Sequence, residues 1–164
     1  MKLFHGSKEC NLEYKSEDSC NIYSGALFFS DSENAAKSHG QYLYSIDIDD
    51  NSVLEHNELV AMQYSGDIDI FSILNSIALD VGLNIDTDEK LERLAELVID
   101  NVGVYNWCDE DIDLLNAFDI TYVGWEAQRI RFILAQKLGY SAVEVRDEHG
   151  ISYMVSNPSL VKEF

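Results

Sequence analysis

Basic residues and proline are both scarce in this chain, and each scarcity limits what it can be. Lysine and arginine together number 11, against 30 aspartate and glutamate residues, which gives a formal net charge of −19. Because phosphate groups are bound by lysine and arginine, so acidic a chain is a poor candidate for direct binding of nucleic acid. Pro158 is the one proline, and no linker-like segment divides the 164 residues. We therefore expect a single domain over residues 1–164.

Cysteine and long hydrophobic runs are scarce as well. The three cysteines, Cys10, Cys20 and Cys108, are odd in number and show no CxxC spacing. This pattern indicates neither a disulfide framework nor a zinc site, so we predict no metal. No apolar run approaches the length of a membrane-spanning helix, and the first residues do not follow the pattern of a secretory leader. We therefore expect a cytoplasmic protein without a membrane partner.

The acidic residues are concentrated in the middle of the chain. Residues 47–119 hold 19 of the 30 acids and only two bases, Lys90 and Arg93. A surface of one sign favours encounters with a surface of the other sign, and basic protein surfaces are commonly where nucleic acid binds. Acidic residues also keep a protein soluble, and this simpler interpretation stays open.

The first third of the sequence predicts strands around one short helix. Residues 2–5 and 25–29 have the composition of strands. Residues 30–33 (SDSE) form a capping-box pattern, which predicts a helix that starts there and ends near residue 39. Residues 41–48 alternate, with Tyr42, Tyr44, Ile46 and Ile48 on one face, and this alternation predicts a strand.

The middle of the sequence predicts helices, and its end predicts a helix followed by two strands. Apolar residues at helical spacing indicate helices over 70–77, from a cap at Thr87 to residue 98, and over 109–118. A helix over 125–138 should stop at Gly139. Strands are then predicted over 140–145 and 151–155, with Ile151, Tyr153 and Val155 on one face and a turn at 146–150. The predicted class is α+β.

Two short polar clusters stand beside predicted strands. His5-Gly6-Ser7 ends the first strand, and Asp147-Glu148-His149 lies in the predicted turn. Each cluster has a plain structural interpretation. His5 would be a buried histidine bonded to a carbonyl, Gly6 a bulge, and residues 147–150 a hairpin turn. His39 would interact favourably with the end of its helix.

Taken together, these motifs resemble the ADP-ribosyltransferase fold. They are LFHGS, GALFF followed by AAKSHG, and EVRDEHG followed by SYMV. The string GWEAQRIRFILAQKLGYSAVEVRDEHG is similar to phage anti-CRISPR proteins that ADP-ribosylate a type I-F CRISPR surveillance complex. The similarity covers residues 1–46 and 124–158. It implies one small ADP-ribosyltransferase-like domain, with strands at both chain ends and an acidic helical insertion at about 47–119.

The resemblance also implies NAD as a substrate and assigns residues to it. Cleavage of NAD passes through an oxocarbenium-like state, so the site must hold the carboxamide, fix the ribose and offer negative charge. A glycine lets its backbone N–H and C=O reach the carboxamide without an intervening side chain. A phenylalanine would form an apolar wall for the nicotinamide ring, and the end of the first helix would help to close the pocket. The residues implied to bind NAD are His5, Gly6, Ser7, Phe28, Ser38 and His39.

The sequence departs from the family pattern at the catalytic acid. Many members carry a glutamate in the returning strand, one residue before an aromatic, and Ser152 stands at that place here. The acid would then come from the preceding turn. Asp147 is our first choice and Glu148 the alternative, because adjacent residues at a strand end point to opposite sides.

Three functions remain in competition. The first, implied by the resemblance, is a mono-ADP-ribosyltransferase acting in the bacterial host cytoplasm. It would modify the DNA-reading subunit of a type I CRISPR surveillance complex, at an asparagine, and so block binding of target DNA. The second is a non-catalytic, acidic mimic of DNA that occludes a basic nucleic-acid-binding surface. The third is an ADP-ribosylating toxin with another cytosolic target. Mimicry requires none of His5, Gly6 and Asp147, so their combination favours the enzyme.

Overall fold

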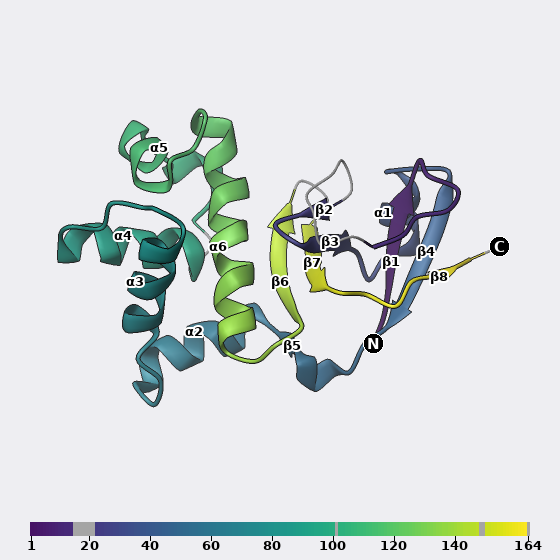
Figure 1. Cartoon of the computed structure of the whole chain (residues 1–164), viewed down its shortest axis with the longest axis horizontal. Helices are drawn as coiled ribbons and strands as arrows, with labels where there is room; N and C mark the ends of the chain where they lie inside the picture. Colours follow the sequence, from purple (N-terminus) through teal and green to yellow (C-terminus); the bar gives the residue numbers. More distant parts are fainter. Residues whose placement is uncertain (15–21, 101, 148–149, 164) are drawn as a thin grey trace. The chain divides into compact units, whose positions relative to one another are not determined.

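The computed structural model describes residues 1–14, 22–100, 102–147 and 150–163 (Figure 1). Contacts within the chain divide it into two compact units. The strand unit comprises Met1–Leu54 and Gly139–Phe164, and the helical unit comprises Glu55–Leu138. Strands therefore lie at both ends of the chain with helices between them, as the sequence predicted. The helical unit and the predicted acidic region overlap over residues 55–119.

The strand unit contains two sheets. A three-stranded sheet has the order β1-β4-β8 and is built from β1 (Lys2–Ser7), β4 (Tyr42–Asp47) and β8 (Val161–Lys162). A five-stranded sheet has the order β2-β3-β7-β6-β5 and is built from β2 (Ile22–Tyr23), β3 (Ala26–Phe29), β5 (Val53–Leu54), β6 (Ala142–Asp147) and β7 (Gly150–Ser156). The pair β5–β6 is parallel, and the other pairs are antiparallel. Helix α1 (Glu33–Lys37) connects β3 to β4.

One hydrophobic core joins the two sheets. Tyr44 and Ile46 of β4 lie in it, and half-buried Tyr42 and Ile48 pack against it, as the alternation of that segment predicted. Both sheets contribute buried side chains to the cluster, among them Leu3, Leu27, Phe29, Tyr153 and Val155. The core therefore fixes β1, through Leu3, relative to β3 and β7.

Three details of the strand unit differ from the prediction. Ser152–Val155 are all buried, because β7 lies in the middle of its sheet and these residues are covered on both faces. Ile151, near the hairpin end of the strand, is exposed. The expected alternation of residues 151, 153 and 155 was therefore wrong. Strand β6 continues to Asp147, which pairs with Gly150, so these two residues belong to strands and not to the predicted turn. Helix α1 is capped by Ser32, whose Oγ accepts the N–H of Ala35, and it ends at Lys37.

The helical unit packs its helices around α6 (Val123–Lys137). Helix α6 contacts α3 (Ile70–Asp80), α4 (Asp88–Val98) and α5 (Asp109–Leu115), as Figure 1 also shows. Thr87 caps α4 and Gly139 follows the end of α6 with a φ of +93°, both as predicted. Helix α2 (His56–Ser65) was not predicted, because Leu59 is its one buried residue and its sequence has no apolar periodicity.

Two arginines tie the helices together. Arg93 Nε donates to Asp111 Oδ1 and Arg93 Nη2 donates to Asp111 Oδ2, each over 2.8 Å. This pair of hydrogen bonds joins α4 to α5. Burial alone would raise the pKa of the Asp111 carboxyl, but the bonds from Arg93 and from the Cys108 amide outweigh it and lower that pKa. Buried Arg131 donates from Nη1 to the carbonyls of Val98 and Ile99, each over 3.0 Å. It thereby satisfies carbonyls at the end of α4 that the helix leaves unpaired.

The Arg93–Asp111 pair generates a stability prediction. Asp111→Ala removes the buried partner of the partly buried Arg93 guanidinium and leaves it only the exposed Glu96 carboxylate, so we expect the free energy of unfolding to fall by about 2–3 kcal/mol. The exposed Asp113→Ala in the same helix is the control and should change it by less than about 0.5 kcal/mol. Both tryptophans, Trp107 and Trp125, lie in the helical unit, so denaturant titration followed by tryptophan fluorescence reports on that unit. Equal denaturant concentrations at the unfolding midpoints of the two variants would contradict the structural role of Asp111.

Candidate active site

The candidate site lies where the two sheets part. The N–H and C=O of Phe4 both bond to the backbone of Ser30, each over 2.8 Å, in an isolated bridge between β1 and the end of β3. Beyond Phe4, the described pairing of β1 is with β4. Backbone groups of alternate residues in a strand point to the same side. The N–H and C=O of Gly6 therefore point away from β4, as those of Phe4 do, on the side where β3 has diverged.

His5 is held in this place as a neutral hydrogen-bond acceptor. Its ring is buried, its Nδ1 lies 2.7 Å from the carbonyl oxygen of Phe28, and it packs at a tilt on Phe29 with 5.6 Å between ring centroids. A carbonyl can only accept, so Nδ1 carries the proton and Nε2 is the acceptor of the neutral ring. Nε2 is buried and has no hydrogen-bond partner among the described residues. Burial lowers the pKa of His5, and nearby His39 lowers it further, against the opposing effect of the Phe28 carbonyl.

Two glycines let the end of α1 pack directly on β1. A Cβ atom on Gly6 would lie 1.8 Å from the carbonyl oxygen of Ala36, and one on Gly40 would lie 2.2 Å from the carbonyl carbon of Ser7. No side chain fits between backbones that approach so closely. Gly6 thus has a packing role that the sequence did not reveal.

The other residues implied to bind NAD surround the same strand end. Ser7 is buried, and its Oγ accepts the N–H of Glu9 over 3.0 Å. Half-buried Phe28 belongs to β3, and its carbonyl holds His5. Exposed Ser38 donates its hydroxyl to the carbonyl of Ala35 over 2.7 Å at the end of α1, and exposed His39 comes next.

Asp147, the first choice for the catalytic acid, lies at the β6–β7 hairpin. Asp147 is the last residue of β6 and pairs with Gly150, whereas Glu148 and His149 lie outside the described residues. Val145, two residues before Asp147, stands directly opposite Ser152. The position of Asp147 is thus close, along the hairpin, to the strand position where many family members carry their glutamate.

The segment that follows β1 is fixed by Tyr44 and Lys162, in roles that the sequence did not reveal. The Tyr44 hydroxyl donates to the carbonyl of Glu9 over 2.8 Å and accepts the N–H of Leu12 over 2.9 Å. Lys162 Nζ donates to the carbonyl of Cys10 over 2.8 Å. The sequence pattern of β4 marked Tyr44 as a core residue, and nothing in it indicated this second role.

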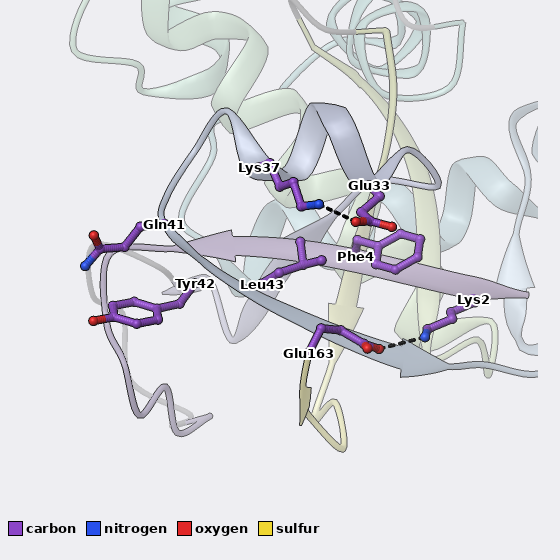
Figure 2. Close-up of a pocket in the computed structure, with 8 residues that line it drawn as sticks. All are labelled: Lys2, Phe4, Glu33, Lys37, Gln41, Tyr42, Leu43 and Glu163. Atoms are coloured by element: carbon purple, nitrogen blue, oxygen red, sulfur yellow. Dashed lines mark hydrogen bonds and ion pairs between the residues drawn. The ribbon is translucent and has the colours of Figure 1, made fainter.

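A separate pocket of about 470 Å³ lies on the three-stranded sheet. Figure 2 shows that two ion pairs border it, Lys2–Glu163 at 2.6 Å and Lys37–Glu33. None of the described residues that line it is among the six implied to bind NAD. Its lining residues are Lys2, Phe4, Glu33, Lys37, Gln41, Tyr42, Leu43 and Glu163. Because its cations are already paired, the pocket is a weaker candidate than the end of β1.

Neither a metal site nor a membrane span is found in the described part of the chain. No group of three or more histidine, cysteine or acidic side chains there is arranged to hold a metal ion. No helix in the described ranges combines the length and the apolar character that crossing a bilayer requires.

Comparisons with known proteins agree with the motifs. Residues 1–163 match the family described as anti-CRISPR type I-F ADP-ribosyltransferase AcrIF11. A crystal structure described as that of an anti-CRISPR protein is similar, with a TM-score of 0.61 and 27% identity over 99% of this chain and 93% of the other. No curated protein matches. The family match also includes the acidic middle of the chain, which none of the quoted sequence motifs covers. The chain therefore belongs to the anti-CRISPR type I-F ADP-ribosyltransferase family and has its α+β fold.

Proposed function

We propose that the protein binds NAD at the end of β1 and ADP-ribosylates the DNA-reading subunit of a type I-F CRISPR surveillance complex. The acceptor would be an asparagine side chain, and its modification would block binding of target DNA in the host cytoplasm. The observation that carries the proposal is the buried Nε2 of His5, an acceptor without a partner among the described residues. A buried polar atom of this kind is costly unless a ligand satisfies it.

The polar groups at the end of β1 suit the nicotinamide riboside end of NAD. Nε2 of His5 would accept a hydrogen bond from a ribose hydroxyl. The N–H and C=O of Gly6 offer one donor and one acceptor, which is what a carboxamide needs. Phe28 would form an apolar wall beside the ring, Ser7 would contact the ribose, and Ser38 and His39 would help to close the pocket. When bound, NAD supplies the ADP-ribosyl group, with nicotinamide as the leaving group.

Asp147 is our choice for the carboxylate, with Glu148 as the alternative. Ser152 carries no charge, so it cannot provide the electrostatic stabilisation that a glutamate gives at that position. The proximity of Asp147 to Ser152 along the hairpin supports the choice. The acid would stabilise positive charge on the ribose and would leave most of the binding to the residues of β1.

A pure mimic of DNA is the alternative function. The acidic composition is compatible with it. Mimicry gives no reason, however, for a buried histidine nitrogen that has no hydrogen-bond partner among the described residues. The family name also describes an enzyme. The type I-F system in that name supports the proposed target.

His5→Ala should remove most of the effect of NAD on stability. NAD at 100 times its dissociation constant stabilises a folded protein by about 2.7 kcal/mol, which raises the melting temperature by several degrees. We expect this shift for the unmodified chain and for the control Tyr64→Ala, an exposed aromatic of the helical unit, but not for His5→Ala. Burial lowers the pKa of His5 below its ordinary value of 6.5, so the ring is neutral at pH 6.5 and above. The NAD-dependent rise in melting temperature should therefore decline only below pH 6.5, where the ring becomes protonated and Nε2 can no longer accept a hydrogen bond. No NAD-dependent shift in the unmodified chain would overturn the proposal.

Gly40→Ala should disturb the site from the side of α1. The added Cβ would lie 2.2 Å from the carbonyl carbon of Ser7, so the end of β1 must move. We expect an increase of roughly tenfold or more in the dissociation constant for NAD, as when buried polar contacts are misaligned. Gly103→Ala is the matched control, because a Cβ there meets no atom within 4 Å. Calorimetric titration with NAD that gives equal constants for both variants would contradict this placement of the site.

Asp147→Asn should reduce turnover and leave NAD binding nearly unchanged. A carboxylate that acts on charge developing in the transition state contributes to the rate and little to ground-state binding. We expect transfer to a purified type I-F surveillance complex to slow by roughly 100-fold or more, on the scale of other lost electrostatic groups, when mass spectrometry follows the modified peptide. Full activity of Asp147→Asn together with an inactive Glu148→Gln would reverse the two assignments. Activity in both variants would show that neither residue is the catalytic acid, whereas an unmodified chain that transfers no ADP-ribose would favour the DNA mimic.

A further inference from the structure

Three exposed aromatic side chains stand together at the start of α6. Phe118, Tyr122 and Trp125, which we term the aromatic patch, are 87%, 48% and 47% exposed. The rings of Phe118 and Tyr122 meet edge to face, with 5.9 Å between their centroids. Tyr122 and Trp125 are three residues apart at the beginning of the helix and so share a face. Exposed apolar groups that cluster in this way mark interaction sites in soluble proteins.

The backbone beneath the patch is firmly held. Asp119 accepts the N–H of Thr121 over 2.8 Å and so caps the short 3-10 helix Ile120–Tyr122. The ring of Trp107 packs against Gly124, where a Cβ would come within 2.7 Å of it. The patch therefore presents its rings from a fixed backbone, which lowers the entropy lost when a partner binds.

The charge around the patch is acidic. Helix α5 contacts the 3-10 helix at the patch and carries the exposed acids Asp109, Glu110 and Asp113. The helical unit holds 17 acids and five bases. Each of the five bases is already bonded within the unit: Lys90 to Asp86, Arg93 to Asp111, Arg129 to Glu126, Arg131 to the carbonyls at the end of α4, and Lys137 to Asp80. The remaining carboxylates therefore present a strongly negative surface.

We propose that the aromatic patch and the exposed acids of α5 dock the protein on a basic, arginine- and lysine-rich protein surface of the type I-F surveillance complex. Guanidinium groups stack on aromatic faces and pair with carboxylates, so such a surface complements both features. Nucleic acid is disfavoured because its phosphates would meet the acids of α5. A second copy of this chain is disfavoured because each copy carries a net charge of −19. The inference rests on the proposed function for the identity of the partner.

The aromatic contribution is tested by binding kinetics. Phe118→Ala combined with Tyr122→Ala should raise the dissociation constant for the purified type I-F surveillance complex by roughly tenfold or more, as expected when exposed aromatic anchors are truncated. The matched control combines Tyr64→Ala and Leu79→Ala, which are 77% and 68% exposed in α2 and α3. The control should bind within about twofold of the unmodified chain, since surface truncations away from an interface have little effect.

The charge contribution is tested by reversal. Changing Asp109, Glu110 and Asp113 to Lys should slow association with the complex at low salt by roughly tenfold or more, and the difference should shrink as salt rises. Asp111 is left out, because its carboxylate is buried against Arg93 and its loss would disturb the fold. The control reverses three exposed acids elsewhere in the unit, Asp67, Asp88 and Glu92, and should slow association less.

Two further readouts separate this inference from the proposed function. The NAD-induced rise in melting temperature, measured without the complex, should be equal in all these variants, because their substitutions lie in the helical unit. If NAD has no effect on the unmodified chain while the patch variants still bind the complex more weakly, docking stands and the enzymatic proposal falls. If patch and control variants bind alike, the inference is overturned. Light scattering that shows a dimer which the patch variants dissolve would also overturn it, in favour of a second copy.

Discussion

The bridge between Phe4 and Ser30 is the contact on which the candidate site depends. Its two hydrogen bonds hold the three-stranded sheet to the end of β3. Had β1 and β3 continued to pair, the backbone groups of Gly6 would be satisfied within the sheet and unavailable to a ligand. Because the strands part there, the N–H and C=O of Gly6 make no ladder hydrogen bond to β3 among the described residues. The bond from His5 to the carbonyl of Phe28 then fixes the imidazole beside them.

The two units differ in what their charged and polar side chains contribute. In the helical unit, the arginines and lysines are bonded to carboxylates or to helix-end carbonyls, which ties the helices together and leaves the surplus acids on the surface. In the strand unit, the end of β1 keeps a buried nitrogen without a partner among the described residues. The first arrangement suits recognition of a charged partner, and the second suits binding of a small polar molecule.

The sequence predicted those parts of the fold whose signals are local. The cap at Thr87, the stop at Gly139 and the strand over β4 depend on a few neighbouring residues, and all three were correct. Helix α2 lacks an apolar stripe and was missed. The burial of both faces of β7 depends on its central place in the sheet, which residues 151–155 do not encode by themselves.

Similar limits apply to the site. The His-Gly-Ser motif identified the strand end, but the reason Gly6 is needed for packing lies in Ala36, 30 residues later. The partner of Asp111 is Arg93, and the hydroxyl that fixes the segment after β1 belongs to Tyr44. Such pairings arise only when distant segments meet, so no pattern in a single sequence reveals them. The aromatic patch was missed because exposure cannot be read from residue type.

The division of the strand unit between the two chain ends has a consequence for protein synthesis. Strand β3 pairs with β7, so the five-stranded sheet cannot form until about residue 156 has left the ribosome. The helical unit, residues 55–138, is contiguous and can begin to fold earlier, because domains generally fold as units during synthesis. Until then, the N-terminal segment that carries His5 lacks the C-terminal strands of its unit. The strand unit, which carries the candidate site, is therefore assembled only after residues up to about 156 have been made.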